Sequence, residues 1–518
     1  AEDGIRDVER SRGLGDVYKR QIFIVVILAT TAFASNGTQI GTVGARSTSM
    51  GSCFRGLADD WSAVFFNPAG LTQLGKWTIG GSTGLIIPRG SYTADPYPVY
   101  PFSGMYTTQV DATPKNFYVP SIGVFYKPSE KLVVGVGVYA PFGLGTEWDL
   151  LTLPLSYGNA TGISKQNETY SDHQVIDVQP TVAFKLSEKI SVGLGVSYVW
   201  GKMTIDQVVL AWNPVLGEVA PDVSRWKALQ LAVASMGGIL PDLTADQDRI
   251  AVENNLSGDG SAYGFNFGLH FKLSEKLSVG FSGRYWTDLK LSGTNKKTMI
   301  MHGDATKAAV IQGIPANYLA DQSDPTGEVN KAQLLALFSG QNIPDEYDAK
   351  ANLPLPMTLG GGIAFKPCPK LTLTADFSWT NWAKWDKISI TGENHDTINM
   401  EENWKNTLEI GGGFEFLAAE RESSQFFVRG GFYTVDTPAP DETMSPTILD
   451  PNRRYVITGG LGLNLGKISF NLAYEHVLFK DKDVKEYVFD PTTGAAENYA
   501  GLYKFHASVI TFGTSIGL

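Results

Sequence analysis

The sequence predicts an all-β fold, a 14-stranded antiparallel transmembrane β-barrel, from three observations. Long runs alternate apolar residues with small polar ones, a tight polar turn recurs between such runs, and the connections alternate between short and long. Transmembrane barrels combine these features, because one face of each strand meets lipid while the other faces a polar lumen.

The composition is compatible with one large barrel. The chain has 518 residues, and 42 Lys and Arg face 53 Asp and Glu, which gives a net charge of −11. This balance argues against a basic nucleic-acid-binding protein. A mean hydropathy of −0.07 argues against a bundle of transmembrane helices. The 56 glycines and 11% aromatic residues favour many strands.

The first residues have the pattern of an export signal. Lys19 and Arg20 precede a short apolar run at 22–28, and Ala32-Phe33-Ala34 follows it. A positive region, an apolar core and an A-x-A site define a secretory signal peptide, and the run is too short to span a bilayer. We therefore expect a non-native leader at 1–18, a signal peptide at 19–34 and a mature chain beginning near Ser35. Export combined with a barrel predicts the outer membrane of a Gram-negative bacterium.

A polar turn containing Ser-Glu-Lys recurs along the chain. Its copies are residues 125–132, 184–190, 271–277 and, in a degenerate form, 365–371. The runs after the turns alternate with period two. In 190–200, for example, Ile190, Val192 and Leu194 fall on the face opposite Ser191 and Gly193. Each turn is therefore expected to close a β-hairpin.

Alternation and turns together predict fourteen strands. Their ranges are 75–90, 115–127, 131–141, 173–187, 189–200, 261–273, 277–292, 356–367, 370–390, 402–417, 425–436, 453–465, 467–480 and 503–518. Short connections belong on the periplasmic side and long ones outside, so both chain ends are expected in the periplasm. The longest predicted extracellular loops are 201–260 and 293–355.

Two segments ahead of the first strand point to a family. They are residues 44–51 and 58–71, the second containing Asn67-Pro68-Ala69-Gly70. They resemble the N-terminal hatch of the FadL/TodX outer-membrane transporters of long-chain fatty acids and aromatic hydrocarbons, which carries an Asn-Pro-Ala motif. Residues 376–382, 404–407 and 428–433 are also similar to that family. The chain ends Gly517-Leu518, whereas many such barrels end in an aromatic residue that the insertion machinery recognises.

The resemblance implies the domain organisation and the route. Residues 35–74 would form the hatch, a plug inside the lumen of a barrel at 75–518. A hydrophobic substrate would be captured outside, pass to an internal pocket and leave sideways through a gap in the wall. Asn67, Pro68, Ala69 and Gly70 would then be hatch or channel residues, the alternative being an ordinary turn.

Helical patterns in the two long loops are candidate capture surfaces. Trp226, Leu229 and Val233 share one helical face, and Leu334, Leu335 and Phe338 share another. By resemblance these loops form an external apolar groove. The alternative is that they pack on each other as a loop core.

Four charged residues fall on the lumen face by alternation: Arg284, Asp376, Arg429 and Glu475. Arg284 or Arg429 could bind the carboxylate of a substrate, because guanidinium pairs well with carboxylate. The alternative is a set of ion pairs that holds the plug to the wall.

No pattern for catalysis or metal binding stands out. The six histidines show no HExxH spacing, no G-x-S-x-G elbow stands out, and the glycine-rich run 459–462 precedes no predicted helix, as a dinucleotide-binding loop would. Cys53 and Cys368 could form a disulfide or remain free thiols. We expect no cofactor and no metal. The expected partners are hydrophobic small molecules, outer-membrane lipid and lipopolysaccharide, and the barrel-insertion machinery, without nucleic acid.

The sequence therefore favours a channel for hydrophobic compounds that catalyses no reaction. Two rival functions stay open, a lipid-acting enzyme built on a barrel and a surface barrel for adhesion or structure. The sequence does not choose between fatty acids and aromatic hydrocarbons, since both require only apolar walls.

Overall fold

The structure is a computed structural model, and it describes residues 37–518 except for 42, 97–108, 151–168, 213–217, 221–222, 225–226, 228–229, 232–233, 236–238, 240–248, 301–304, 320–324, 340–342, 394, 396, 449 and 489–496. The predicted leader and signal peptide, together with Trp226, Leu229 and Val233, lie outside the described residues.

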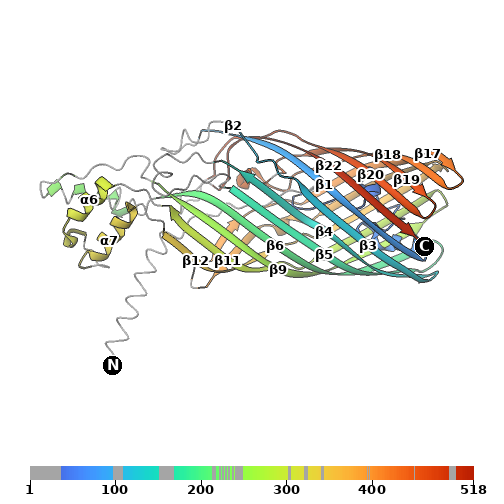
Figure 1. The fold of residues 1–518 in the computed structure, drawn as a ribbon, viewed down its shortest axis with the longest axis horizontal. Coiled ribbons are helices and arrows are strands. Elements are labelled where there is room, and N and C mark those ends of the chain that lie inside the picture. Colours follow the sequence, from blue (N-terminus) through green and yellow to red (C-terminus); the bar gives the residue numbers. More distant parts are fainter. Residues whose placement is uncertain are drawn as a thin grey trace, which may run out of the picture.

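Fourteen antiparallel strands close into one barrel, which confirms the predicted fold class (Figure 1). In chain order they are β1 (Trp77–Ala94), β3 (Phe117–Ser129), β4 (Leu132–Trp148), β5 (Thr169–Lys185), β6 (Ile190–Trp212), β9 (Arg249–Lys272), β10 (Leu277–Trp286), β13 (Thr358–Cys368), β14 (Leu371–Thr380), β17 (Thr407–Arg421), β18 (Ser424–Val435), β19 (Arg454–Leu465), β20 (Ile468–Phe479) and β22 (Gly501–Gly517). Each pairs with the next, and β1 pairs with β22 from Thr78–Gly517 to Ala94–Gly501, which closes the cylinder.

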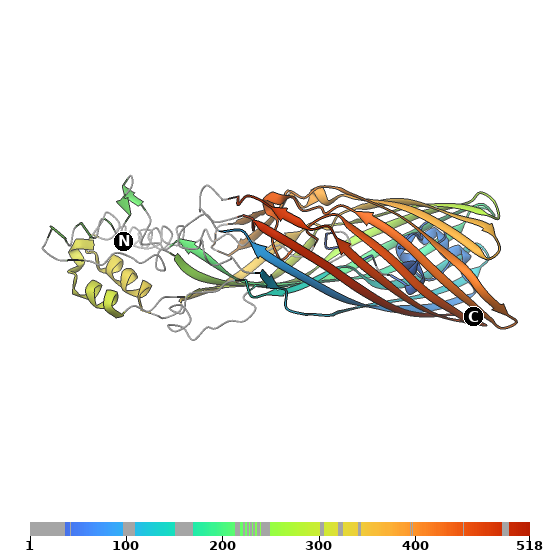
Figure 2. The same cartoon turned by 90° about the horizontal axis from the view of Figure 1, so that it is seen from above.

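Shorter strands extend the wall at its outer end. They are β2 (Gln109–Asp111), β11 (Leu289–Ile300), β12 (Ile343–Leu353), β15 (Lys387–Gly392), β16 (Ile398–Glu401) and β21 (Lys482–Val484). β11 pairs with β9 and β12 and so continues the wall that β10 begins. Beyond this wall lie a hairpin of β7 (Glu218–Ala220) and β8 (Val223–Ser224) and the helices α6 (Ala305–Gly313), η5 (Ala316–Leu319) and α7 (Glu328–Leu337) (Figures 1 and 2).

The loop ranges predicted from the sequence were too wide. β6 and β9 pair through residues 201–212 and 249–260, and β11 and β12 pair through 289–299 and 343–353. β6 and β9 have 23 and 24 residues, whereas a tilted strand needs about 10 to cross a membrane. The strands therefore continue well past the span of a bilayer. The predicted strand 370–390 is also interrupted, by the short helix η6 (Trp382–Lys384).

The outward face of the barrel is apolar and the inward face is packed. Along β6, Leu194, Val196 and Tyr198 are exposed, while Gly193 and Gly195 between them face inward with the buried Ser197. The same alternation holds along β5, where every second residue from Thr169 to Ala183 is buried. The predicted division between a lipid face and a lumen face thus matches the burial of the strands.

The N-terminal segment fills the lower lumen. Residues 37–76, here called the plug, contain α2 (Ala45–Ser49), α3 (Ala63–Phe66) and η1 (Pro68–Gln73). These helices lie within the cylinder, toward the end where the C-terminus lies (Figure 2). Met50, Phe54 and Val64 of the plug are fully buried against the barrel. Among the described residues, no helix is long and apolar enough to span a membrane.

Candidate functional site

The Asn-Pro-Ala-Gly turn joins the plug to the wall. Asn67 is fully buried, and its Nδ2 donates to the carbonyl oxygens of Arg55 and Leu269, each at 3.0 Å. Its Oδ1 accepts from the N–H of Ala69 at 3.2 Å, which caps η1. A Cβ at Gly70 would lie 2.2 Å from the carbonyl oxygen of Ala58, so only glycine fits there. The turn packs mainly on β5, β6 and β9.

Arg429 belongs to an ion network between plug and wall. Its Nε donates to Glu415 Oε2 at 2.6 Å, and Nη1 donates to Asn471 at 2.9 Å. Arg46 of the plug donates to the same Glu415 oxygen at 2.8 Å and to Asp59 at 2.6 Å. Arg429 is therefore fully engaged, as the alternative reading of the sequence described.

Asp376 forms a second connection of this kind. Its Oδ2 accepts from the backbone N–H groups of Phe54 and Arg55, at 3.0 and 2.9 Å, and lies 3.4 Å from Arg55 Nη1. These bonds hold the middle of the plug to β14, since all three end on one buried carboxylate.

Arg284 differs from Arg429 and Asp376, and it shares with the buried Glu475 the lack of an ion pair within the described residues. It is 8% exposed, and its Nη2 donates to the carbonyl oxygen of Phe65. The guanidinium lies over three rings, with its carbon 4.2 Å from the Phe65 centroid, 5.5 Å from that of Tyr139 and 5.3 Å from that of Trp286. It forms no ion pair with any carboxylate in the described part of the chain, and its Nε has no hydrogen-bond partner there.

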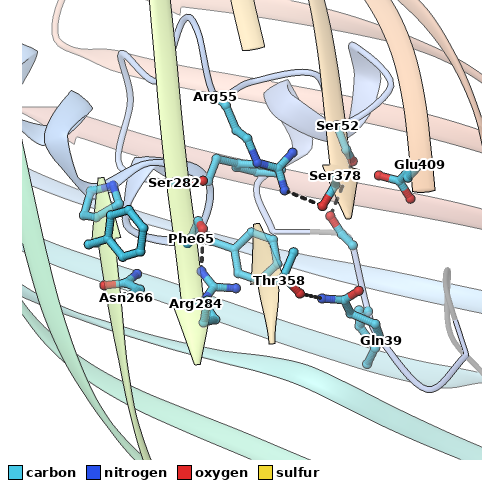
Figure 3. A pocket seen from close by; sticks show the side chains of 16 residues that line it. Gln39, Ser52, Arg55, Phe65, Asn266, Ser282, Arg284, Thr358, Ser378 and Glu409 are labelled. Atoms are coloured by element: carbon cyan, nitrogen blue, oxygen red, sulfur yellow. Dashed lines mark hydrogen bonds between the residues drawn. The ribbon is translucent and has the colours of Figure 1, made fainter. Parts of the chain in front are cut away.

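A cavity lies beside Arg284, between the plug and strands β9, β10, β13, β14 and β17, the last contributing Glu409 (Figure 3). Its lining combines the side chains of Gln39, Arg55 and Phe65 from the plug with Thr358 and Ser378 from the wall. Arg55 Nη2 donates to Ser378 Oγ at 3.0 Å, and Gln39 Nε2 donates to Thr358 Oγ1 at 3.2 Å. The cavity thus has both polar and apolar walls, and Phe65 and Phe66 of the plug contribute aromatic rings.

An aromatic cluster lies next to the Arg284 guanidinium. Its members are Phe142, Trp286, Trp382, Trp385 and Trp404, all buried. The ring of Trp286 is 5.1 Å from that of Phe142, which is 6.4 Å from Trp382, and Trp385 stacks on Trp404 at 4.4 Å. Arg284 therefore stands at the boundary between a polar cavity and an apolar, aromatic region.

The wall is interrupted at β4. The register with β5 passes from Tyr139–Asp177 to Phe142–Val175, so β4 carries one extra residue at Ala140-Pro141. Pairing between β3 and β4 ends at Ile122–Val138, although β3 continues outward for five more residues, to Phe117. The family resemblance implied a gap in the wall but not its position, and Pro141, the last residue of the predicted strand 131–141, is a sequence sign of where it lies.

The first residues of the plug cover this interruption from inside. Gln39 pairs with Phe142 as an isolated antiparallel bridge. The N–H of Ile40 donates to the carbonyl of Pro141 at 2.8 Å, and the N–H of Gly143 donates to that of Thr38 at 3.0 Å. Backbone groups that an unbroken ladder would satisfy are satisfied here by the plug.

The remaining candidate residues lie apart from this region. Leu334 and Leu335 are half-buried in α7, and Phe338 just after it is buried at 3% exposure. Cys53 is buried in the plug while Cys368 is exposed at a turn, and both are free thiols. Within the described ranges, no three His, Cys, Asp or Glu side chains are grouped so as to hold a metal ion.

A closed barrel filled by its own N-terminal segment, with a partly polar lumen and an interrupted wall, is the architecture of an outer-membrane channel with a plug. The chain belongs to the OMPP1/FadL/TodX family of outer membrane transport proteins, whose model matches residues 25–516. It is accordingly an outer-membrane transporter of hydrophobic compounds.

Two related proteins are consistent with this family membership. A putative outer membrane protein of Neisseria meningitidis serogroup B is 23% identical over 88% of this chain and 90% of its own length. A long-chain fatty acid transport protein of Escherichia coli is 21% identical over 85% and 86%.

Solved structures show the same fold. A FadL homologue of Pseudomonas aeruginosa superposes with a TM-score of 0.67 at 16% identity, covering 93% of this chain and 99% of its own. The toluene transporter TodX of Pseudomonas putida superposes with a TM-score of 0.60 at 14% identity, covering 92% and 98%.

Proposed function

We propose that this protein takes up long-chain fatty acids through the outer membrane and catalyses no reaction. The substrate enters at the outer loops, passes the aromatic cluster, engages Arg284 with its carboxylate and leaves through the gap beside β4. Family membership supports a hydrophobic substrate, but relatives include both a long-chain fatty acid transport protein and a toluene transporter. The choice between the two substrate classes therefore depends on this chain's own residues.

The observation that favours a fatty acid is the state of Arg284. A guanidinium without an ion-pair partner, placed where a polar cavity meets an aromatic cluster, matches a molecule with an anionic head and an apolar tail. A hydrocarbon such as toluene could offer this cation only the face of its ring, which is a weaker partner than a carboxylate. Arg429 offers no such site because Glu415 and Asn471 already occupy it.

The gap in the wall supports a sideways exit. An acyl chain moving from water into lipid gains about 0.8 kcal/mol for each methylene that becomes buried, so a lateral route is downhill. Thr38–Ile40 stand in that route, since they bridge to Pro141–Gly143 from the lumen side. We infer that substrate passage requires this short segment of the plug to move, while the turn at Asn67–Gly70 holds the rest in place.

Capture at the cell surface is proposed for the outer loops. Leu334 and Leu335 are partly accessible on α7, whereas Phe338, just after the helix, is buried. An apolar surface at Leu334 and Leu335 would give a fatty acid a first contact. The alternative, a purely structural loop core, predicts that Leu334→Asp and Leu335→Asp leave uptake unchanged.

The deciding experiment compares two substrates and two arginines. Cells lacking their own transporter would express the protein, Arg284→Met or, as control, Arg453→Met in an exposed loop, and take up labelled oleate or toluene. We expect Arg284→Met to reduce oleate uptake about 10-fold or more, the loss typical of a charge-assisted contact. Toluene uptake by that variant and both activities of the control should stay at the parent level. Equal oleate uptake by parent and Arg284→Met would refute the carboxylate assignment, and uptake of neither substrate by the parent would refute the proposed function.

A further inference from the structure

The recurring Ser-Glu-Lys turns have no part in the transport route. They lie at the end of the barrel opposite α6 and α7, where the C-terminus also lies (Figure 1). Because short turns of such barrels face the periplasm, this end is the periplasmic mouth. With the start of β1, these turns carry nine lysines, at positions 76, 127, 131, 185, 189, 272, 276, 366 and 370. The same turns carry only three acidic residues, Glu130, Glu188 and Glu275.

These lysines form one continuous row, here called the lysine arc. The N–H of Lys127 donates to the carbonyl of Lys76 at 2.9 Å, and the N–H of Lys185 donates to that of Lys131 at 2.8 Å. The same bond joins Lys272 to Lys189 at 2.9 Å and Lys366 to Lys276 at 2.8 Å. Four pairs of like charges thus stand directly across neighbouring strands, an arrangement that is destabilising unless an anion is nearby.

The glutamates do not compensate for this charge. Glu188 and Glu275 each pair with the first lysine of their own turn, at 2.7 and 2.9 Å, and Glu130 lies 3.9 Å from Lys127. The second lysine of each turn forms no ion pair with a carboxylate in the part of the chain that the structure describes. These second lysines are Lys131, Lys189, Lys276 and Lys370.

Strand alternation turns the arc toward the mouth of the barrel and away from lipid. Phe184 faces outward and is exposed, whereas Ala183 and Lys185 on either side of it face inward. The side chain of Lys127 shows this direction, since its Nζ donates to the carbonyl oxygens of Thr72 and Leu74 in the plug, at 3.1 and 3.3 Å. The residues that meet lipid head groups are instead the intervening apolar ones, such as Leu186 and Leu273.

The arc is also one-sided. It covers the strands from β1 to β14, which include the interrupted β4, whereas the turn between β17 and β18 carries Glu420, Arg421 and Glu422 and the turn between β19 and β20 carries a single lysine, Lys467. A basic half-ring on a chain whose net charge is −11 is a local reversal of charge.

We propose that the lysine arc is a docking surface for the acidic face of a soluble periplasmic protein. The lysines of the arc face the mouth, which favours a partner below the mouth over the head groups of the surrounding bilayer. The arc covers β1 to β14, so the partner would lie under the wall that contains β4. The second lysines, which form no ion pair within the described residues, supply most of the attraction. Because all four are exposed to water, the affinity for the partner should fall steeply as the ionic strength rises.

The test uses poly-L-glutamate as the acidic probe and the complete barrel in zwitterionic detergent. Fluorescence anisotropy of the labelled probe would be measured for the parent and for a turn variant, Lys131→Gln, Lys189→Gln, Lys276→Gln and Lys370→Gln. A matched control removes four exposed lysines from the outer strands, Lys202→Gln, Lys290→Gln, Lys296→Gln and Lys350→Gln. We expect the turn variant to bind about 10-fold or more weakly at low salt, with a shallower salt dependence, and the control to stay near the parent.

Two outcomes would overturn the proposal. Equal weakening in the two variants would show that only net charge matters, and no weakening in the turn variant would show that the second lysines do not bind the probe. Loss of probe binding when the parent is placed in nanodiscs containing phosphatidylglycerol, but not in phosphatidylcholine nanodiscs, would assign the arc to anionic lipid instead. Resistance of each variant to unfolding by SDS at room temperature confirms that its barrel is intact.

Discussion

The backbone N–H of Gly37 donates to Asp450 Oδ2 at 2.8 Å, so the plug is fastened at its outer end to the loop between β18 and β19. Asp450 is fully buried and lies 3.3 Å from Arg454, which is also fully buried. Burial raises the pKa of the Asp450 carboxyl to about 6, and the neighbouring Arg454 opposes this rise.

This pKa predicts how acid affects stability. The folded carboxyl binds its proton more tightly than the unfolded one, so the contribution of Asp450 to the free energy of unfolding increases as the pH falls through 6 toward 4. Between pH 7 and pH 5 the parent should gain about 1 kcal/mol relative to Asp450→Asn, which has no proton to bind. Urea unfolding at both pH values measures this difference, and identical pH dependence in the two proteins would contradict it.

A second prediction concerns the segment that covers the wall gap. Gln39 and Phe142 face each other as a non-hydrogen-bonded pair, whose Cα atoms are typically about 4.5 Å apart and within disulfide range. In a Cys368→Ser background, the substitutions Gln39→Cys and Phe142→Cys should form a disulfide on oxidation. This disulfide should block oleate uptake, and its reduction should restore uptake.

A matched pair at the other end of the plug provides the control for this experiment. Thr72 and Ser191 have hydroxyl oxygens 2.9 Å apart, beside η1. Thr72→Cys with Ser191→Cys should cross-link without loss of uptake, because this end of the plug stays in place. Uptake that survives the oxidised Gln39–Phe142 link would mean that substrate takes another route.

The third prediction tests the extra residue of β4. Deleting Ala140 restores a uniform register with β5, which lets β3 and β4 pair further outward. We expect a folded barrel with uptake reduced about 10-fold or more, since the exit is closed. Cell-surface labelling would verify assembly, and full uptake by the deletion variant would argue against this exit.

The fourth prediction separates the two lumen arginines. Arg429→Met leaves Glu415 with Arg46 as its remaining partner and should lower the free energy of unfolding by about 3 kcal/mol. Oleate uptake for each folded molecule should stay unchanged. Arg284→Met should do the opposite, with little change in urea midpoint and a loss of oleate uptake. A shared phenotype would show that both residues are structural.

The barrel could be predicted from the sequence because lipid imposes a simple rule on each strand. Where Leu194 and Val196 must face lipid, alternation is unavoidable. Past the bilayer this constraint ends, and the outward face of β9 becomes polar at Glu253, Asn255 and Ser257. These residues were therefore predicted as loop although they pair along their whole length.

The lumen was only half predictable, for a related reason. Alternation correctly placed Arg284 and Arg429 inside, but alternation carries no information on which side chains meet across the lumen. Glu415 and Arg46 are 369 positions apart in the chain, and their contact arises from how the plug sits in the closed cylinder. The difference between a satisfied arginine and an unsatisfied one therefore became visible only in the folded structure.

The closure of β1 on β22 dictates an order of assembly. Residue 76 leads from the plug straight into β1, and α2 lies across the seam, with the N–H of Gly44 bonded to Ser82 on β1 and Ala45 beside Gly513 on β22. Because the plug lies inside the closed wall, we expect these helices to be seated before β22 completes its pairing with β1. Until the wall closes around the plug, apolar residues such as Phe54 and Trp61 lack part of their cover, and such exposed surface favours aggregation during folding.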